Sequence, residues 1–249
     1  MDNKIAVFVD GGFFVRRVEF FSRKYFGAQK VLPEHMVSIM LHIIDQHQVH
    51  LKKDILYRIY YYDAPPFTEQ LREPVVRPGD KGGARTKNFK TDPRTIRQLD
   101  LHQQLSKTRK VALRMGELAA TKRWILNEYA QKSLLKGDKR IDELTPEDFH
   151  PDFQQKGVDT RIGIDITTLT LSQFVDTMVL IASDADFVPA AKLARTHGVD
   201  VVLDPLFGTV AKGLEKHIDG KKSFDIVKKL SELFNVQPNP IPEWWGVGD

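Results

Sequence analysis

The sequence predicts an α/β fold in which a parallel sheet carries helices on both faces. Short apolar runs stand at residues 4–9, 54–63, 109–116, 178–182 and 198–203, and they are rich in β-branched and aromatic residues. Between these runs, apolar residues recur at the three- and four-residue spacing of helices. Strands that alternate with helices in this way form parallel sheets that are covered on both sides.

Each expected element has a boundary signal of its own. The first strand ends in an Asp-Gly-Gly turn, from which a helix is expected to run to about residue 25. Pro33 and Pro93 each mark a helix start, because proline suits the first helical turn. Further helices are expected at about 162–171, 189–194, 210–217 and 224–234. Residues 124–129 fit either a strand or a helix.

We expect a single domain over residues 1–236, a basic excursion at about 64–108, and a tail at 237–249. Residues 68–88 contain several Pro and Gly residues and show little periodicity, which is typical of a long exposed loop. The tail holds Trp244 and Trp245, which we expect to dock on the domain or on a second subunit. A homodimer is therefore left open.

The composition excludes several classes of protein. The chain of 249 residues has no cysteine, which rules out disulfides and thiolate metal sites. Its net charge is only +4, so total charge alone gives no argument for nucleic acid. No apolar stretch approaches membrane-spanning length, and we expect a cytoplasmic protein with no membrane partner.

Several catalytic and cofactor motifs are missing. No Gly-x-Gly-x-x-Gly follows the first strand, and no Gly-x-x-x-x-Gly-Lys-[Ser/Thr] occurs, so a glycine-rich loop for a nucleotide cofactor is not expected. No Gly-x-Ser-x-Gly elbow is present either. Gly12 stands where a haloacid-dehalogenase-like phosphatase would need a second aspartate after Asp10.

Aspartates remain as the residues that could carry chemistry. Asp184 and Asp186 follow the buried strand at 178–182, and Asp10 follows the first strand. In open α/β sheets, ligands bind at the carboxyl ends of the strands. Carboxylates that lie close together repel one another, and a hard divalent ion such as Mg²⁺ or Mn²⁺ relieves that repulsion. The alternative is that these carboxylates serve only as turn residues or cap the helices that follow.

Several motifs taken together resemble a known family. Phe-Val-Asp-Gly-Gly ends the first strand, Lys-Gly-Val-Asp enters a helix, and Leu-Ile-Ala-Ser-Asp-Ala-Asp-Phe-Val-Pro follows. From residue 4 to about residue 205, the chain resembles the NYN domain family, and within it the LabA-like branch of the PIN-like nucleases. The resemblance implies a Rossmann-like (PIN-like) parallel sheet with an acidic metal site. It also implies RNA cleavage, because the active members of the family cleave RNA.

By position, the resemblance implies four catalytic metal ligands, which are Asp10, Asp159, Asp184 and Asp186. Asp10 and Asp184 would bind the ion directly, while Asp159 and Asp186 would hold a second ion or water. Asp165 would be an alternate ligand, although it lies about 120° around an ideal helix from Asp159. Water would be the nucleophile in phosphodiester hydrolysis.

One position departs from the family. Many members have Asn three residues after the first Asp, and here that position is Phe13. Two functions therefore stay open. The first is a metal-dependent ribonuclease, and the alternative is a catalytically silent protein that regulates by binding RNA or a protein partner.

A basic segment gives the argument for RNA. Residues 70–125 hold fourteen Lys and Arg against five Asp and Glu. Such a local excess suits a phosphate backbone. The alternative is an ordinary solvated loop whose charges pair with acidic residues. We expect the segment to lie beside the aspartates, with RNA contacts made by Lys81, Arg85, Lys87, Lys90 and Arg94.

Overall fold

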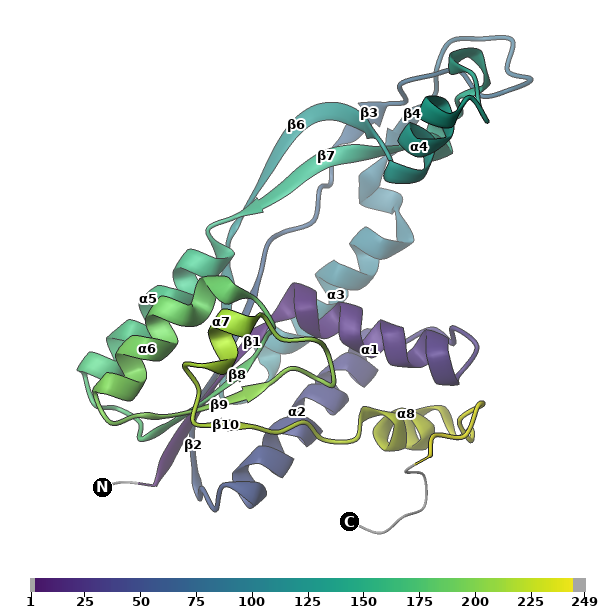
Figure 1. Ribbon diagram of the computed structural model, residues 1–249. Helices are drawn as coiled ribbons and strands as arrows, with labels where there is room; N and C mark the ends of the chain where they lie inside the picture. The colour runs from purple at the N-terminus through teal and green to yellow at the C-terminus, as the bar shows by residue number, and fades with distance from the viewer. Residues whose placement is uncertain (1–2, 244–249) are drawn as a thin grey trace. The chain divides into compact units, whose positions relative to one another are not determined.

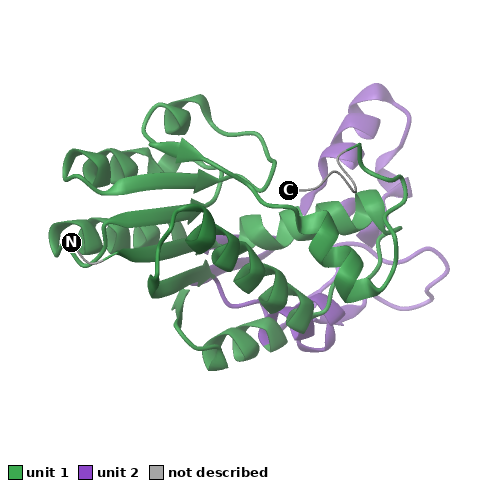
Figure 2. Cartoon of the chain, turned by 90° about the horizontal axis from the view of Figure 1, so that it is seen from below, with its two compact units in different colours: residues 1–63, 100–116, 157–249 green, residues 64–99, 117–156 purple. Residues whose placement is uncertain are grey.

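The structure is a computed structural model that describes residues 3–243, and the chain divides into two compact units (Figure 2). Unit 1 comprises residues 1–63, 100–116 and 157–249, and unit 2 comprises residues 64–99 and 117–156. The expected excursion at 64–108 overlaps unit 2 over residues 64–99. Trp244 and Trp245 lie outside the described residues. Among residues 3–243, no helix is long and apolar enough to cross a membrane.

Unit 1 is built on a six-stranded sheet, and all of its neighbouring strands pair in parallel (Figure 1). The strand order is β10-β9-β8-β1-β2-β5. The predicted fold class is therefore confirmed. The strands are β1 (Lys4–Asp10), β2 (Ile55–Asp63), β5 (Val111–Met115), β8 (Thr177–Ile181), β9 (Asp200–Asp204) and β10 (Gly220–Lys221).

Strand β1 lies at the point where the strand order reverses. From β1 the chain first adds β2 and β5 on one side, and it then adds β8, β9 and β10 on the other. Val9 is paired with Ile181 of β8, and Asp10 is paired with Tyr62 of β2. The carboxyl ends of β1, β2 and β8 therefore meet at one edge of the sheet, where this class of fold binds ligands.

Helices cover both faces of the sheet in unit 1. Figure 1 shows α1, α2 and α8 on one face and α5 and α6 on the other. Alternate residues of β1 explain this, since Ile5, Val7 and Val9 pack into the core with α1 and α2, whereas Ala6 and Phe8 are buried on the opposite side. The helices are α1 (Gly11–Tyr25), α2 (Pro33–His50), α5 (Val158–Leu171), α6 (Val188–Thr196), α7 (Lys212–Glu215) and α8 (Ile226–Phe234).

Unit 2 has a smaller core built from aromatic side chains. Phe67 and Phe89 pack against Phe153, with ring centroids 4.5 and 5.4 Å from it. The Trp124 indole closes this cluster and donates to the Arg72 carbonyl at 2.7 Å. Its elements are the antiparallel pairs β3 (Gln70–Arg72) with β4 (Thr86–Asn88) and β6 (Glu117–Leu126) with β7 (Phe149–Lys156), and helix α4 (Glu128–Lys136). Helix α3 (Pro93–Lys107) runs from unit 2 into unit 1.

The structure refines two local expectations and adds one strand that the sequence analysis did not predict. Of residues 124–129, which by sequence fit either a strand or a helix, 124–126 end strand β6 and 128–129 begin helix α4, so the range contains both. The polar stretch 149–156 is also a strand, because pairing with β6 satisfies its backbone groups. The helix expected at 210–217 is wrong in length, since α7 covers only Lys212–Glu215.

Candidate functional site

Asp10 is placed by the junction of β1 and α1. Its carboxylate caps α1 by accepting a hydrogen bond from the Phe13 N–H at 3.0 Å. The turn needs Gly11, because a Cβ there would lie 2.5 Å from the Tyr61 ring and 2.6 Å from the Tyr62 carbonyl oxygen. The Phe13 side chain is buried in the core, so this position supplies its backbone N–H and no polar side chain.

Asp184 and Asp186 follow the fully buried strand β8. Asp184 caps the single 3-10 turn Ala185–Phe187, accepting from the Asp186 N–H at 3.1 Å. Both carboxylates are exposed, whereas Phe187 is fully buried and fixes the turn. The capping alternative thus holds for one oxygen of Asp184, and the carboxylate still faces solvent at the edge of the sheet.

Helix α5 carries two aspartates that point in different directions. Gly157 is the N-cap of the helix, with φ 74°, so Asp159 does not cap it and lies exposed in the first turn. Asp165 is buried two turns later and accepts from the Tyr62 hydroxyl at 2.8 Å and from Arg114 Nε at 2.8 Å. The structure therefore does not bring Asp165 together with Asp159.

The four other aspartates affect one another electrostatically. The pKa of Asp10 is raised, mainly by burial and further by the nearby Asp159 carboxylate, although the Phe13 N–H and the Arg16 guanidinium oppose the shift. Burial also raises the pKa of Asp159, and the carboxylates of Asp184 and Asp186 add to that shift. Asp159 is therefore electrostatically coupled to Asp10 of β1 and also to the two aspartates that follow β8.

The donor chemistry fits a hard divalent ion, but the ligands are not assembled. Within residues 3–243, no group of three or more His, Asp or Glu side chains is arranged so that it could hold a metal ion. The hydrogen bonds that reach Asp10 and Asp184 occupy only one oxygen of each. Asp159 and Asp186 are exposed to solvent. Four hard oxygen donors at one edge suit Mg²⁺ or Mn²⁺, and side-chain rotation would be needed to gather them.

The sequence analysis missed three residues at this edge. Asp63 ends β2, is 5% exposed, and pairs with His102 Nε2 at 2.8 Å. Its charge helps to raise the pKa of Asp10 after burial and Asp159. Arg16 lies over the first turn of α1, where its Nη1 would be 3.1 Å from a Cβ on Gly12. Asp63 had a signal in the sequence, since it too follows an apolar strand, but neither His102 nor Arg16 had one.

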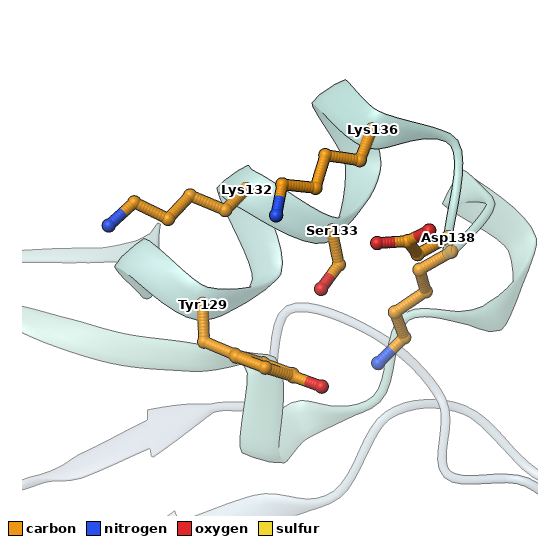
Figure 3. A pocket seen from close by; sticks show the side chains of 6 residues that line it. Tyr129, Lys132, Ser133, Lys136 and Asp138 are labelled. Carbon is orange, nitrogen blue, oxygen red and sulfur yellow. The ribbon is translucent and has the colours of Figure 1, made fainter.

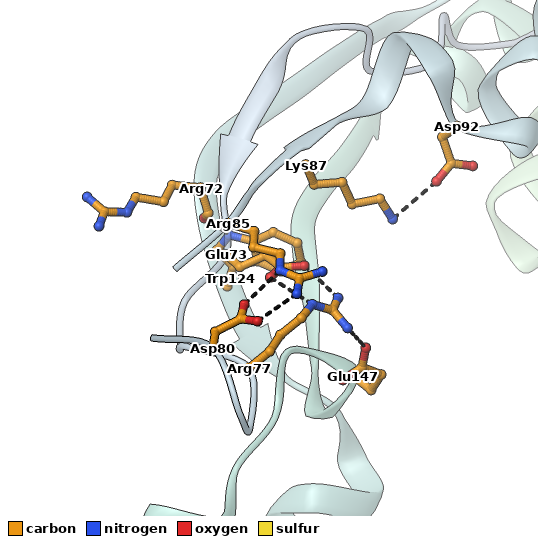
Figure 4. Close-up of polar contacts among 9 residues, drawn as sticks. All are labelled: Arg72, Glu73, Arg77, Asp80, Arg85, Lys87, Asp92, Trp124 and Glu147. Atoms are coloured by element: carbon orange, nitrogen blue, oxygen red, sulfur yellow. Dashed lines mark hydrogen bonds and ion pairs between the residues drawn. The ribbon is translucent and has the colours of Figure 1, made fainter. Parts of the chain in front are cut away.

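The basic residues of unit 2 are partly neutralised (Figure 4). Arg85 pairs with Asp80 through two hydrogen bonds of 2.7 and 2.6 Å, which raises the pKa of Arg85. Lys87 pairs with Asp92 at 3.1 Å. Among the described residues, neither Lys81 nor Lys90 has an ion pair, and the side chain of Arg94 lies electrostatically close to Asp92. The solvated-loop alternative therefore describes Arg85 and Lys87 better than it describes Lys81 and Lys90.

Unit 2 also has a lysine-lined pocket of about 460 Å³ (Figure 3). It is lined by Tyr129, Lys132, Ser133, Lys136, Asp138 and Lys139. Two of its lysines are already paired, Lys132 with Glu128 and Lys139 with Asp148. Its remaining charge is therefore small.

Comparison with known proteins points to the NYN domain. Residues 89–212 match the NYN domain family, a range that contains the aspartates of α5 and of the turn after β8 but not Asp10. The resemblance inferred from the motifs is confirmed over this range, and the LabA-like branch stays a prediction. The match suggests a nuclease-like function.

Two proteins are similar to larger parts of the chain. An uncharacterised protein of Methanocaldococcus jannaschii is 29% identical over 135 residues, which are 53% of this chain and 50% of that protein. The chain thus spans about half the length of this relative. A crystal structure of a protein of unknown function from Vibrio parahaemolyticus covers 89% of this chain and 93% of its own, with 14% identity and a TM-score of 0.43.

Proposed function

We propose that this protein is a divalent-metal-dependent endoribonuclease that hydrolyses phosphodiester bonds of single-stranded RNA. Asp10, Asp159, Asp184 and Asp186 would hold Mg²⁺ or Mn²⁺ and form the catalytic centre. The observation that carries the proposal is that carboxylates from three separate segments lie close enough to influence one another electrostatically, and burial and mutual repulsion raise the pKa of Asp10 and Asp159. Perturbed carboxylates in such a position are typical of functional sites.

The charge balance of the edge supports a cation. Ionised carboxylates that repel one another cost stability unless an opposite charge lies nearby. Arg16 is the cation that lowers the pKa of Asp10, and no cation opposes the rise in the pKa of Asp159 among the causes of that shift. A divalent ion would relieve the remaining repulsion, and its binding would favour the ionised form of every ligand.

The chain's own residues would have separate tasks. The Phe13 N–H holds one oxygen of Asp10, which leaves the other to bind. Arg16, exposed beside Asp10, can pair with a phosphate of the substrate. A bound divalent ion would supply charge neutralisation at the phosphoryl oxygens and would position water for attack.

Unit 2 would contribute RNA binding. Lys81 and Lys90 have no ion pair to a described acid, and Arg94 stands on the first turn of α3. Arg85 and Lys87 would have to exchange Asp80 and Asp92 for phosphates. Such contacts position RNA without reading its sequence. A chain without cysteine suits the reducing cytoplasm, where we place the protein.

A second function is favoured by one observation. The side chain of Phe13 is buried, so the polar group that many family members have at this position is missing from the edge of the sheet. A catalytically silent protein that regulates by binding RNA or a protein would need neither that group nor an assembled set of ligands.

One experiment separates the two functions. Labelled single-stranded RNA is incubated with the full chain in Mn²⁺ or Mg²⁺, in excess chelator, and with the Asp184→Asn variant. A ribonuclease cleaves only with metal, and the variant loses at least ~100-fold in rate, the scale of one transition-state electrostatic contact. RNA that is bound but never cleaved with either metal would favour the regulator, and cleavage in chelator would exclude the metal mechanism.

A further inference from the structure

The exposed face of α1 carries basic and aromatic side chains in alternation, starting near Asp10. Arg16, Phe20 and Lys24 are all exposed and are spaced four residues apart, so they lie along one side of the helix. Phe20 is 38% exposed. The helix as a whole holds four basic residues and one acid, Glu19. This stripe is therefore both aromatic and positively charged.

The loop after β9 presents a second aromatic ring. Leu206 and Phe207 have φ values of 45° and 57°, in the left-handed region that non-glycine residues rarely occupy. Phe207 is 55% exposed, while Leu206 is fully buried. Gly208 completes the turn, because a Cβ there would lie 2.9 Å from the Pro205 carbonyl oxygen. The backbone is thus held in a strained form that leaves a large ring in solvent.

Arg17 ties this loop to α1. Its Nε and Nη2 donate to the Leu206 carbonyl at 3.0 and 2.8 Å. The same guanidinium lies over the rings of Phe20 and Phe21, 4.6 and 5.1 Å from their centroids. Phe21 in turn meets Phe207 edge to face at 6.1 Å. The two exposed rings, Phe20 and Phe207, therefore belong to one fixed cluster, which is prearranged for a planar ligand.

We propose that α1 and the 205–208 loop form a base-stacking track for single-stranded RNA that extends from the aspartates. This inference rests on the proposed function, because it takes RNA as the substrate. Helix α1 starts at the residue after Asp10, and at 1.5 Å per residue Phe20 lies about 15 Å along its axis. The loop belongs to the same edge of the sheet, since Asp204 at the end of β9 is paired with Ile181 of β8.

Single-stranded RNA fits this surface better than a protein does. Exposed aromatic rings beside arginine and lysine are the means by which proteins hold unpaired bases and the phosphates between them. Stacking tolerates any base, so the track would add affinity without sequence preference. A protein partner would have to bury the positive charges of Arg16 and Lys24 against acidic groups of its own.

The test uses binding in chelator, so that no cleavage interferes. Affinities of the full chain are measured by fluorescence anisotropy for labelled oligouridylate and for an abasic strand of equal length. Phe207→Leu keeps apolar bulk at the same backbone angles but removes the ring face. It should weaken oligouridylate binding roughly 5- to 100-fold and leave the abasic strand unchanged. Phe20→Leu should act in the same direction.

Phe174→Leu is the matched control. This ring is 48% exposed in unit 1 and stacks on Tyr57, but it precedes β8 and so belongs to the opposite end of the strands. Its replacement should change neither affinity. Melting temperatures of all variants check that each one folds.

Several results would overturn the track. These are equal affinity of wild type and Phe207→Leu, equal weakening for both strands, or no wild-type binding of oligouridylate. A change of oligomeric state in Phe207→Leu, seen by sedimentation, would instead assign the patch to a contact between two copies. Because binding is measured without metal, a base-dependent effect of Phe207→Leu supports the track even if the protein never cleaves RNA. Metal-dependent cleavage without that effect would leave the proposed function standing and remove the track.

Discussion

Replacement of Asp165 separates a structural carboxylate from a metal ligand. Asp165 is 7% exposed and accepts hydrogen bonds from the Tyr62 hydroxyl and from two nitrogens of Arg114. A hydrogen bond to a charged group contributes roughly 1.5–3 kcal/mol. The Arg114 side chain is 46% exposed, so solvent reduces its share. Asp165→Asn keeps one acceptor and turns an amide toward Arg114, and we expect a loss of about 2–3 kcal/mol.

That loss corresponds to a fall in melting temperature of about 4–12 °C, at 2–4 °C per kcal/mol for a chain of this size. Thermal unfolding is followed by circular dichroism, and RNA cleavage in Mn²⁺ is measured on the same samples below the transition. Asp165→Asn should retain most of its cleavage rate. The control, Asp184→Asn, is exposed and should unfold within about 0.5 kcal/mol of wild type while losing cleavage.

The opposite pattern would refute this reasoning. If Asp165→Asn unfolded like wild type and lost cleavage as completely as Asp184→Asn, then Asp165 would bind the metal. Its contacts with Tyr62 and Arg114 would then have to be replaced when the ion binds.

Further predictions concern pH and RNA binding. Burial, with help from nearby carboxylates, raises the pKa of Asp10 above the ordinary 3.8, so its ionisation costs stability as pH rises through the raised value. In chelator, Asp10→Asn should therefore melt higher than wild type at pH 7 and equally below pH 3.8; a lower melting point at pH 7 would contradict the repulsion. Lys81→Glu with Lys90→Glu should weaken binding of every single-stranded RNA, and flatten the log–log salt dependence by up to ~0.7 per lost contact. Arg85→Ala with Lys87→Ala should weaken RNA binding less. Equal log–log salt slopes in the two double variants would show that ion pairing inside unit 2 does not decide which cations contact RNA.

The positions of most strands along the chain could be predicted, because the sequence signals of a strand are local. Strands β1, β8 and β9 are short apolar runs that are almost fully buried in the parallel sheet, and β2 and β5 are apolar runs that are partly exposed. Strand β7 could not be predicted, because its residues are polar and it exists through pairing with β6. The length of α7 was also missed, since a single helical turn has too few residues to show a period.

The candidate site was predictable only where residues follow strands. Asp10 ends the apolar strand β1, and Asp184 follows shortly after the apolar strand β8. Both therefore lie at the carboxyl edge of the sheet. Asp165 was harder to place, because its burial depends on Arg114 of β5, a partner 51 residues away. His102 stands in the middle of a helix and meets Asp63 only through the packing of α3.

The most direct test is a titration of the full chain with Mn²⁺, followed by the electron paramagnetic resonance signal of the free ion. Wild type and Asp165→Asn should both remove Mn²⁺ from solution with similar affinity. Asp184→Asn and Asp159→Asn should each bind it at least ~10-fold more weakly, because each removes a hard oxygen donor and its charge. Equal binding by all four proteins, or loss of binding in Asp165→Asn alone, would contradict a metal centre built from the aspartates of β1, α5 and the turn after β8.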